Sequence, residues 1–301
     1  MSPTRPRQTT QRIIQGDCLK VMADMEPDSV NLIFGSPPYE DARTYGIDFK
    51  LKGQDWVDWM VRIYEEASRV SKGLVAFVVQ GRTRKFKWSC TPALLIADLH
   101  RAGFNVREPI YYHRVGIPGS GGPDDMRHDL EYVVRVSKPG RLVWSDNTAC
   151  GEPCKYAEGG MLSHRTQQGD RVSIVDPKSG HTLVSKRTSG RLVSHRDNND
   201  KYSPRIYQNP KIANPGNVIK CRVGGGALGS KLAHENEAPF PEKLAEFFIK
   251  SFCPPGGIVL DPFSGSGTTI AVAKKCYRDG IGIDVRESQV ELTQRRLLEA
   301  L

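Results

Sequence analysis

Four consecutive residues near the start of the 301-residue chain carry groups suited to chemistry on an amine; they are Ser36, Pro37, Pro38 and Tyr39. An amine on an aromatic ring is a poor nucleophile because its lone pair is delocalised, so catalysis needs two acceptors that hold its N–H groups and aim the lone pair. The Ser36 hydroxyl and the Pro37 carbonyl can be those acceptors, and the Tyr39 ring offers a face for stacking. A Pro-Pro-Tyr sequence alone is also compatible with a loop or a polyproline ligand.

A glycine-rich segment, Asp261 to Thr268, has the composition of a ligand-binding turn. Its Gly265 and Gly267 allow a tight turn and a close approach of backbone to ligand, and the helix predicted to follow offers free N–H groups. Asp284 ends the next predicted strand, about 20 residues further on, where an acidic side chain can accept hydrogen bonds from ribose hydroxyls. This spacing also fits a dinucleotide enzyme, but the Ser36 segment, which follows its own strand, favours the amine chemistry.

The elements that must position these residues alternate between strands and helices. Apolar runs predict strands, and 3.6-residue periodicity predicts helices. The strands are expected at 12–15, 30–34, 74–79, 110–114, 130–136, 258–260 and 281–283, and the helices at 55–70, 91–102, 242–252, 268–277 and 288–300. This alternation predicts an α/β fold with a doubly wound, mostly parallel sheet, whose ligands bind at the carboxyl ends of the strands.

A polar, basic stretch interrupts that alternation. Residues 141–222 hold 14 Lys and Arg against 7 Asp and Glu, in a chain whose net charge is +9. Such a segment indicates a polyanionic partner, with a solvated basic surface as the alternative. We therefore divide the chain into residues 1–140, an inserted segment 141–230 and residues 231–301, and expect a hairpin at 171–175 and 181–185 within the insert.

Composition argues against several other classes of protein. The seven cysteines are odd in number and scattered, which disfavours a disulfide framework. The closest pair, Cys150 and Cys154, lacks the further ligands of a zinc site, so no metal is expected. No apolar run approaches the length of a membrane span. We expect a cytoplasmic protein that binds no membrane.

Three motifs in this order resemble the beta group of DNA amino-methyltransferases. They are Ser36 to Gly46 (SPPYEDARTYG), His234 to Pro241 (HENEAPFP) and Asp261 to Thr269 (DPFSGSGTT). The resemblance covers residues 12–139 and 234–300. It implies a Rossmann-like, circularly permuted methyltransferase that uses S-adenosylmethionine and binds DNA, with the insert as target recognition region. It leaves the oligomeric state and a cognate restriction endonuclease open.

The resemblance also implies roles for single residues. Phe263, Gly265 and Gly267 would line the pocket for the methionine part of the cofactor, and Asp284 would bind its ribose. The other residues implied at the cofactor are Asp17 at the adenine, Phe240 and Pro241 closing the pocket, and Asp261 and Thr268 within the glycine-rich motif. The candidates for DNA contact are Arg43, Arg165, Arg171, Lys186, Arg187, Arg191, Arg196, Lys201 and Arg205.

The most detailed prediction concerns which atom of the base is methylated. In the resembled family, Ser at the first motif position is associated with N4 of cytosine, and Asp or Asn with N6 of adenine. Ser36 therefore implies N4-cytosine methylation, with N6-adenine methylation and a catalytically silent DNA-binding homologue as alternatives. Methylation at C5 of cytosine would need a cysteine nucleophile. Cys154, preceded by Pro153, is the available candidate, but it lies in the irregular insert and not after a strand.

Overall fold

A computed structural model describes residues 8–41, 49–117, 123–154, 164–165, 171–172, 192–196, 202–206, 210–223 and 226–299. The chain forms two compact units. The first comprises Met1–Asp146 and Gly216–Leu301, and the second comprises Asn147–Pro215. Among the described residues, no helix combines the length and the apolar composition that crossing a bilayer requires.

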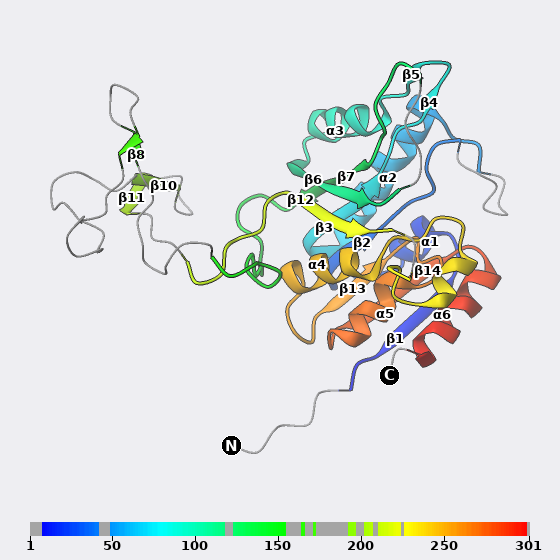
Figure 1. The fold of residues 1–301 in the computed structure, drawn as a ribbon. Helices are drawn as coiled ribbons and strands as arrows, with labels where there is room; N and C mark the ends of the chain where they lie inside the picture. Colours follow the sequence, from blue (N-terminus) through cyan, green and yellow to red (C-terminus); the bar gives the residue numbers. More distant parts are fainter. Residues whose placement is uncertain are drawn as a thin grey trace. The chain divides into compact units, whose positions relative to one another are not determined.

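An eight-stranded sheet organises the first unit (Figure 1). Its order is β1 (Gln11–Gln15), β14 (Asp279–Asp284), β13 (Ile258–Asp261), β2 (Val30–Gly35), β3 (Ser71–Val79), β7 (Leu130–Ser137), β6 (Asn105–Val115) and β12 (Val218–Arg222). Only β7 runs antiparallel to its neighbours in this sheet.

Helices cover both faces of the sheet. One face packs against α1 (Cys18–Ala23), α2 (Gly53–Val70) and α3 (Thr91–Arg101). The other packs against α4 (Glu242–Phe252) and α5 (Thr268–Lys275), with α6 (Glu287–Glu299) beside α5 and the short 3-10 helix η1 (Lys231–Glu235) beside α6. The α/β fold with a doubly wound, mostly parallel sheet is therefore confirmed.

Strand β3 shows why the sheet is covered on both sides. Its side chains alternate, with Val75, Phe77 and Val79 in the core under α2 and α3, and Leu74, Ala76 and Val78 in the core under α4 and α5. A strand buried on both faces reads as a continuous apolar run, as this one does. Helix α2 buries a matching stripe that includes Trp56, Met60 and Tyr64.

Five elements of the first unit were not predicted, namely η1 and the four described next. Helix α1 is too short to show a periodicity, although Asp17 caps it by accepting hydrogen bonds from the N–H groups of Leu19 and Lys20. Strands β4 (Thr83–Arg84) and β5 (Lys87–Trp88) form a two-residue hairpin within a basic, polar stretch. Strand β12 was assigned to the insert, but it is an edge strand of the main sheet, and its alternating Ile219 and Cys221 are buried in the core under α4.

The second unit is smaller than the predicted insert. Residues 141–146 and 216–230, which the predicted segment 141–230 includes, belong to the first unit. The cause is β12, whose pairing with β6 returns the chain to the main sheet.

Two short antiparallel pairs lie within the second unit. They are β8 (His164–Arg165) with β9 (Arg171–Val172), and β10 (Leu192–Arg196) with β11 (Tyr202–Ile206). Residues 171–172, which open the first strand of the predicted hairpin, thus pair with residues before them. Residues 181–185, its second strand, lie outside the described residues.

Candidate active site

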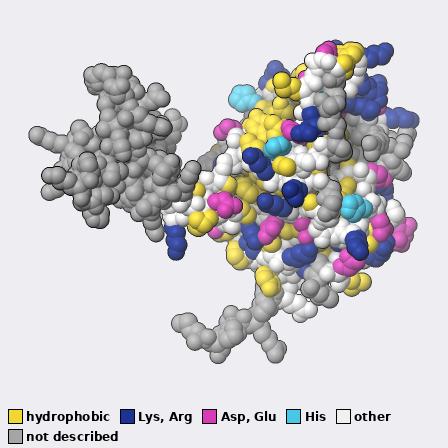
Figure 2. All heavy atoms as spheres, in the orientation of Figure 1, with side chains coloured by type: hydrophobic (Ala, Val, Ile, Leu, Met, Phe, Trp, Pro, Cys, Tyr) yellow, Lys and Arg dark blue, Asp and Glu magenta, His cyan; other side chains and the backbone are white. Residues whose placement is uncertain are grey.

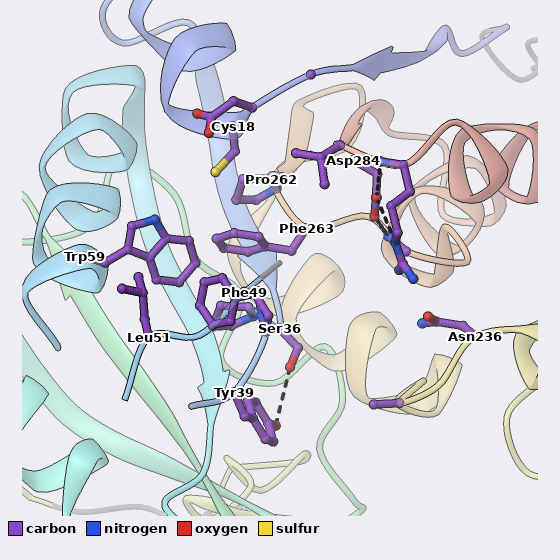
Figure 3. Close-up of a pocket in the computed structure, with 18 of the residues that line it drawn as sticks. Cys18, Ser36, Tyr39, Phe49, Leu51, Trp59, Asn236, Pro262, Phe263 and Asp284 are labelled. Atoms are coloured by element: carbon purple, nitrogen blue, oxygen red, sulfur yellow. Dashed lines mark hydrogen bonds and ion pairs between the residues drawn. The ribbon is translucent and has the colours of Figure 1, made fainter. Parts of the chain in front are cut away.

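The carboxyl ends of β14, β13 and β2 meet around one cavity of about 440 Å³ (Figure 3). From β2 the chain continues through α2 to β3 on one side, whereas from β13 it continues through α5 to β14 on the other. Ligands of open α/β sheets bind at such a switch point. The cavity is lined by Gly16, Asp17, Cys18, Ser36, Pro37, Pro38, Tyr39, Phe49, Lys50, Leu51, Trp59, Asn236, Ala238, Pro262, Phe263, Gly265, Asp284, Val285 and Arg286.

Asp284 both lines the cavity and holds its glycine-rich wall. Its Oδ2 accepts a hydrogen bond from the Gly265 N–H at 2.9 Å, and its Oδ1 accepts one from the Arg286 N–H at 2.9 Å. Gly265 has a φ of +50° and Gly267 one of +72°, values that L side chains rarely adopt. The two glycines therefore shape the loop, and Asp284 fixes it in front of the cavity.

The aromatic side of the cavity was largely missed by sequence reasoning. Trp59 packs edge-on against Phe49 at 5.1 Å between ring centroids, and lies 5.7 Å from the ring of Phe263. Figure 3 shows Trp59, Phe49 and Leu51 on one side and Asp284 and Asn236 on the other. The periodicity of α2 indicated a core position for Trp59. Periodicity identifies the apolar side chains of a helix, but it does not reveal which of them line a cavity.

Five residues expected at the cofactor do not line the cavity but support it. Phe240 contacts Phe34 edge-on at 5.5 Å, and Pro241 caps α4. The Thr268 hydroxyl accepts a hydrogen bond from Arg296 at 2.8 Å. The other two are Gly267, whose backbone lies against Thr293, and Asp261. Asp17, by contrast, lines the cavity as expected.

Asp261 is buried behind the loop that it begins. Its Oδ1 accepts a hydrogen bond from the Phe263 N–H at 3.0 Å, and a Cβ atom at Gly35 would lie 2.2 Å from that oxygen. Burial raises the pKa of Asp261 to about 7, and the nearby charge of Asp284 adds to the rise, whereas the neighbouring Thr269 hydroxyl and the hydrogen bond from the Phe263 N–H lower it. Asp261 thus shapes the loop from below.

This raised pKa makes the contribution of Asp261 to stability depend on pH. An exposed aspartate ionises near pH ~4, so between about pH 4 and about pH 7 the native state holds a proton that the unfolded chain has lost. The contribution of this group to the free energy of unfolding therefore falls as pH rises through that window. Asn cannot ionise and keeps an acceptor for Phe263.

We expect Asp261→Asn to gain melting temperature relative to the original chain as pH rises from about 5 to about 8. Thermal unfolding of both proteins at the two pH values measures this difference. A difference that stays constant with pH would show that Asp261 is ionised in the native protein throughout.

The Ser36 segment is held by contacts from strand β3 and helix α2. The one proton of the Ser36 hydroxyl has two acceptors within reach, the Val78 carbonyl at 3.3 Å and the Tyr39 hydroxyl at 3.4 Å. The Trp56 indole donates to the Pro38 carbonyl at 2.9 Å, and so does not occupy the Pro37 carbonyl. Ser36 and Tyr39 point toward one another at one end of the cavity (Figure 3).

A buried carboxylate, Glu131 on β7, orients Tyr39. The Tyr39 hydroxyl donates to Glu131 Oε2 at 2.9 Å, and Arg114 lies 3.0 Å from Oε1. Burial raises the pKa of Glu131, whereas Arg114 and Tyr39 lower it. Sequence reasoning missed this residue, and the available signal was a single acidic side chain in the otherwise apolar stretch that opens β7.

Glu40, next to Tyr39, is a second missed residue. Its Oε2 accepts from the Gly53 N–H at 2.9 Å, and its Oε1 accepts from the Thr91 hydroxyl at 2.9 Å and from the Arg82 N–H at 3.2 Å. It is 5% exposed. Glu40 thereby ties the Ser36 segment to the starts of α2 and α3 and to the chain that enters the β4–β5 hairpin.

The candidates for DNA contact lie mostly beyond what the structure describes. Arg43, Lys186, Arg187, Arg191 and Lys201 fall outside the described residues, and of Arg165, Arg171, Arg196 and Arg205 only the strand positions on β8, β9, β10 and β11 are described. Where side chains are described, no group of three or more His, Cys, Asp or Glu is arranged to hold a metal ion.

The serine hydroxyl and the glycine-rich loop follow two adjacent parallel strands. A comparison with known protein families covers both of them. The profile of a family described as DNA methylase, of the N6 and N4 type, matches residues 30–295. The chain belongs to this DNA methylase family. It is therefore a DNA methyltransferase of the N6/N4 class, which confirms the resemblance that its three motifs indicated.

Individual relatives span nearly the whole chain. The DNA adenine methyltransferase YhdJ of Escherichia coli K12 is 27% identical over 299 residues, which cover 98% of this chain and 85% of YhdJ. The solved PvuII DNA methyltransferase, described as cytosine-N4-specific, superimposes with a TM-score of 0.64 at 18% identity, covering 96% of this chain and 86% of that one.

A putative DNA modification methylase of Thermus thermophilus, solved in complex with S-adenosyl-L-methionine, superimposes with a TM-score of 0.56 at 22% identity. The match covers 97% of this chain and 94% of that one. At these identities the two solved structures establish the shared fold.

Proposed function

We propose that this DNA methyltransferase moves a methyl group from S-adenosylmethionine to the N4 amine of cytosine. The observation that carries the proposal is that the Ser36 hydroxyl, the Tyr39 ring and Asp284 all line one cavity. A base that leaves the duplex can be reached by such a cavity, whereas a base inside the duplex cannot. Mass spectrometry of nucleosides from treated DNA tests the proposal, which requires N4-methylcytosine.

The residues of the cavity fit the proposed cofactor. S-adenosylmethionine would supply the electrophilic methyl group. Asp284 would accept hydrogen bonds from the ribose hydroxyls, since its Oδ2 has a second lone pair beyond the one that the Gly265 N–H uses, and the second contact to Oδ1, from Arg286 Nε at 3.5 Å, is long. Asp17 would hold the adenine, and Phe263 and Gly265 would border the methionine part. The Thermus thermophilus methylase that was solved with this cofactor supports the assignment.

Ser36 and Pro37 would act on the amine itself. Their hydroxyl and carbonyl oxygens would accept its two N–H bonds and aim the nitrogen lone pair at the methyl group. Tyr39 would stack on the base while Glu131 holds its hydroxyl.

Adenine N6 is the second candidate acceptor. The relative YhdJ, described as an adenine methyltransferase, favours it, whereas Ser36 and the PvuII methyltransferase favour cytosine. The same nucleoside analysis distinguishes the two, because N6-methyladenine in place of N4-methylcytosine would overturn the choice of base and leave the amine chemistry intact.

Two other readings have less support. A catalytically silent homologue would not need Ser36, Asp284 and the glycine-rich loop in one cavity, and transfer of a radiolabelled methyl group to DNA tests this directly. Attack through Cys154 finds little support, since its N–H pairs with the Lys211 carbonyl in an irregular part of the second unit.

We further propose that the second unit, within the predicted segment 141–230, is the target recognition region. The surrounding segments then form a circularly permuted methyltransferase, in which residues 1–140 supply the catalytic motif and residues 231–301 the cofactor motif. The excess of Lys and Arg in this segment supports a role in phosphate contact.

Glu131 should act on the reaction only through Tyr39. We expect Glu131→Leu, which removes the acceptor, and Tyr39→Phe, which removes the donor, each to lower turnover by about tenfold, and the double variant to be little worse than either, because the two residues share one hydrogen bond. Turnover of the four proteins on the same DNA measures this coupling. Affinity for S-adenosylmethionine should be unchanged in all of them. Additive losses would show that Glu131 acts by another route.

A further inference from the structure

The β4–β5 hairpin, residues 82–88, is an exposed basic element that ends in an aromatic side chain. It carries four cations and no acidic residue in its sequence RTRKFKW. Phe86, at its tip, is 79% exposed. Figure 2 shows the dark blue side chains of Lys and Arg gathered over this corner of the molecule, at the upper right. Neither the cavity chemistry nor the predicted DNA contacts make use of this hairpin.

The turn of the hairpin is built to present Phe86. Thr83 pairs with Trp88 and Arg84 with Lys87, which leaves Lys85 and Phe86 as the two turn residues. Their φ angles are +47° and +61°, a left-handed conformation that glycine or asparagine usually supplies in such turns. Lysine and phenylalanine therefore occupy turn positions whose backbone conformation favours glycine or asparagine. Burial of the Phe86 ring does not offset this unfavourable conformation, because the ring is exposed.

The base of the hairpin is fixed to the catalytic segment. Arg82 donates its N–H to Glu40 at 3.2 Å, and its side chain donates to the Asp41 carbonyl. Arg84 lies 2.7 Å from the Asp41 carboxylate. Because Glu40 and Asp41 directly follow Tyr39, the hairpin is held at the same edge of the sheet as the catalytic cavity. The net charge of the hairpin remains positive even when the Asp41 carboxylate is counted with it.

A second cavity of about 440 Å³ lies between the hairpin and the start of β7. Its rings are Trp88 and Tyr132, which lie nearly parallel at 6.4 Å between centroids. Arg127 and His128 also line it, and its one carboxylate, Asp129, pairs with Arg127 and His113. Leu130 and Tyr132 are the neighbours of Glu131 along β7, although Glu131 itself does not line this cavity.

We propose that the β4–β5 hairpin is a DNA-contacting element, in which Lys85 and Lys87 bind backbone phosphates and Phe86 inserts into the base stack beside the extruded base. Apolar side chains at basic protein surfaces unstack DNA in this way, and extrusion of a base leaves a gap that a ring can fill. The proposal rests on the proposed function, because it assigns the hairpin to the DNA that the catalytic cavity acts on.

Binding of a fluorescent duplex of random sequence, measured by anisotropy over a range of salt concentrations, tests the phosphate contacts. Each phosphate contact adds about 0.9 to the slope of log affinity against log salt. We expect the double variant Lys85→Gln/Lys87→Gln to bind more weakly and with a slope smaller by nearly twice that amount. An unchanged affinity and slope would overturn the proposal, even if the chain transferred no methyl group.

Methyl transfer to plasmid DNA tests Phe86. We expect Phe86→Ala to lower the rate about tenfold or more, since stacking on a base is lost, with affinity for S-adenosylmethionine unchanged. Leu298→Ala is the matched control, because Leu298 on α6 is 75% exposed and lies away from the hairpin. A normal rate for Phe86→Ala would overturn the insertion, as would an altered oligomeric state with DNA affinity retained, which would assign the tip to a second copy of the chain.

Discussion

Ser36→Ala should lower turnover by about two to three orders of magnitude, the usual cost of deleting one group that stabilises a transition state. The substitution removes an acceptor for the target amine. It should leave affinity for S-adenosylmethionine nearly unchanged, because the side-chain contacts that hold the glycine-rich loop come from residues other than Ser36, namely Asp284, Asp261, Thr293 and Arg296. Single-turnover methyl transfer and calorimetric titration of the cofactor measure the two quantities separately.

Ser68→Ala is the matched control for this prediction. Ser68 lies on α2, and its hydroxyl is buried without a hydrogen-bond partner. The same loss of one oxygen there should leave turnover unchanged. Full activity of Ser36→Ala would show that the hydroxyl takes no part in the reaction, and the role assigned to the whole Ser36 segment would then be lost.

Asp284→Ala should have the largest effect on the cofactor. Two charge-assisted hydrogen bonds to ribose hydroxyls contribute about 1.5–3 kcal/mol each, so the dissociation constant should rise at least about a hundredfold. The loss would be compounded because the N–H groups of Gly265 and Arg286 lose their common acceptor. Calorimetry with S-adenosylmethionine measures the effect without any turnover.

The opposite end of the same strand supplies the control. Asp279, the first residue of β14, accepts a hydrogen bond from the Thr10 N–H at 2.9 Å, away from the cavity. Asp279→Ala should cost stability without weakening cofactor binding in the folded protein. Comparable affinities in the two variants would remove Asp284 from the binding site.

The parts of the fold that could be predicted are those with a local signal. The helix at 242–252 has the predicted bounds, because it begins after Pro241, ends before Pro254 and carries a full amphipathic period. Ser36 and Asp284 could be placed in one site because Ser36 directly follows one parallel strand and Asp284 ends another, and the carboxyl ends of such strands share an edge of the sheet.

The parts that could not be predicted depend on partners that are distant in sequence. Glu131 reaches Tyr39 from 92 positions away, so no local pattern links them. Phe240 was expected to close the cofactor pocket, and in the structure its ring packs against Phe34 of β2. Aromatic side chains near a site are indistinguishable in sequence, and only the packing of strands and helices determines which of them reach the cavity.

The pairing of β1 with β14 determines when the sheet can be completed during synthesis of the chain. Gln11 lies opposite Gly280 and Gln15 opposite Asp284, so β1 must wait for a partner strand that is synthesised much later. A nascent chain already contains Ser36 and the hairpin while β13 and β14 are still untranslated. Because the cavity does not exist until those two strands have joined the sheet, DNA modification cannot begin before Asp284 has left the ribosome.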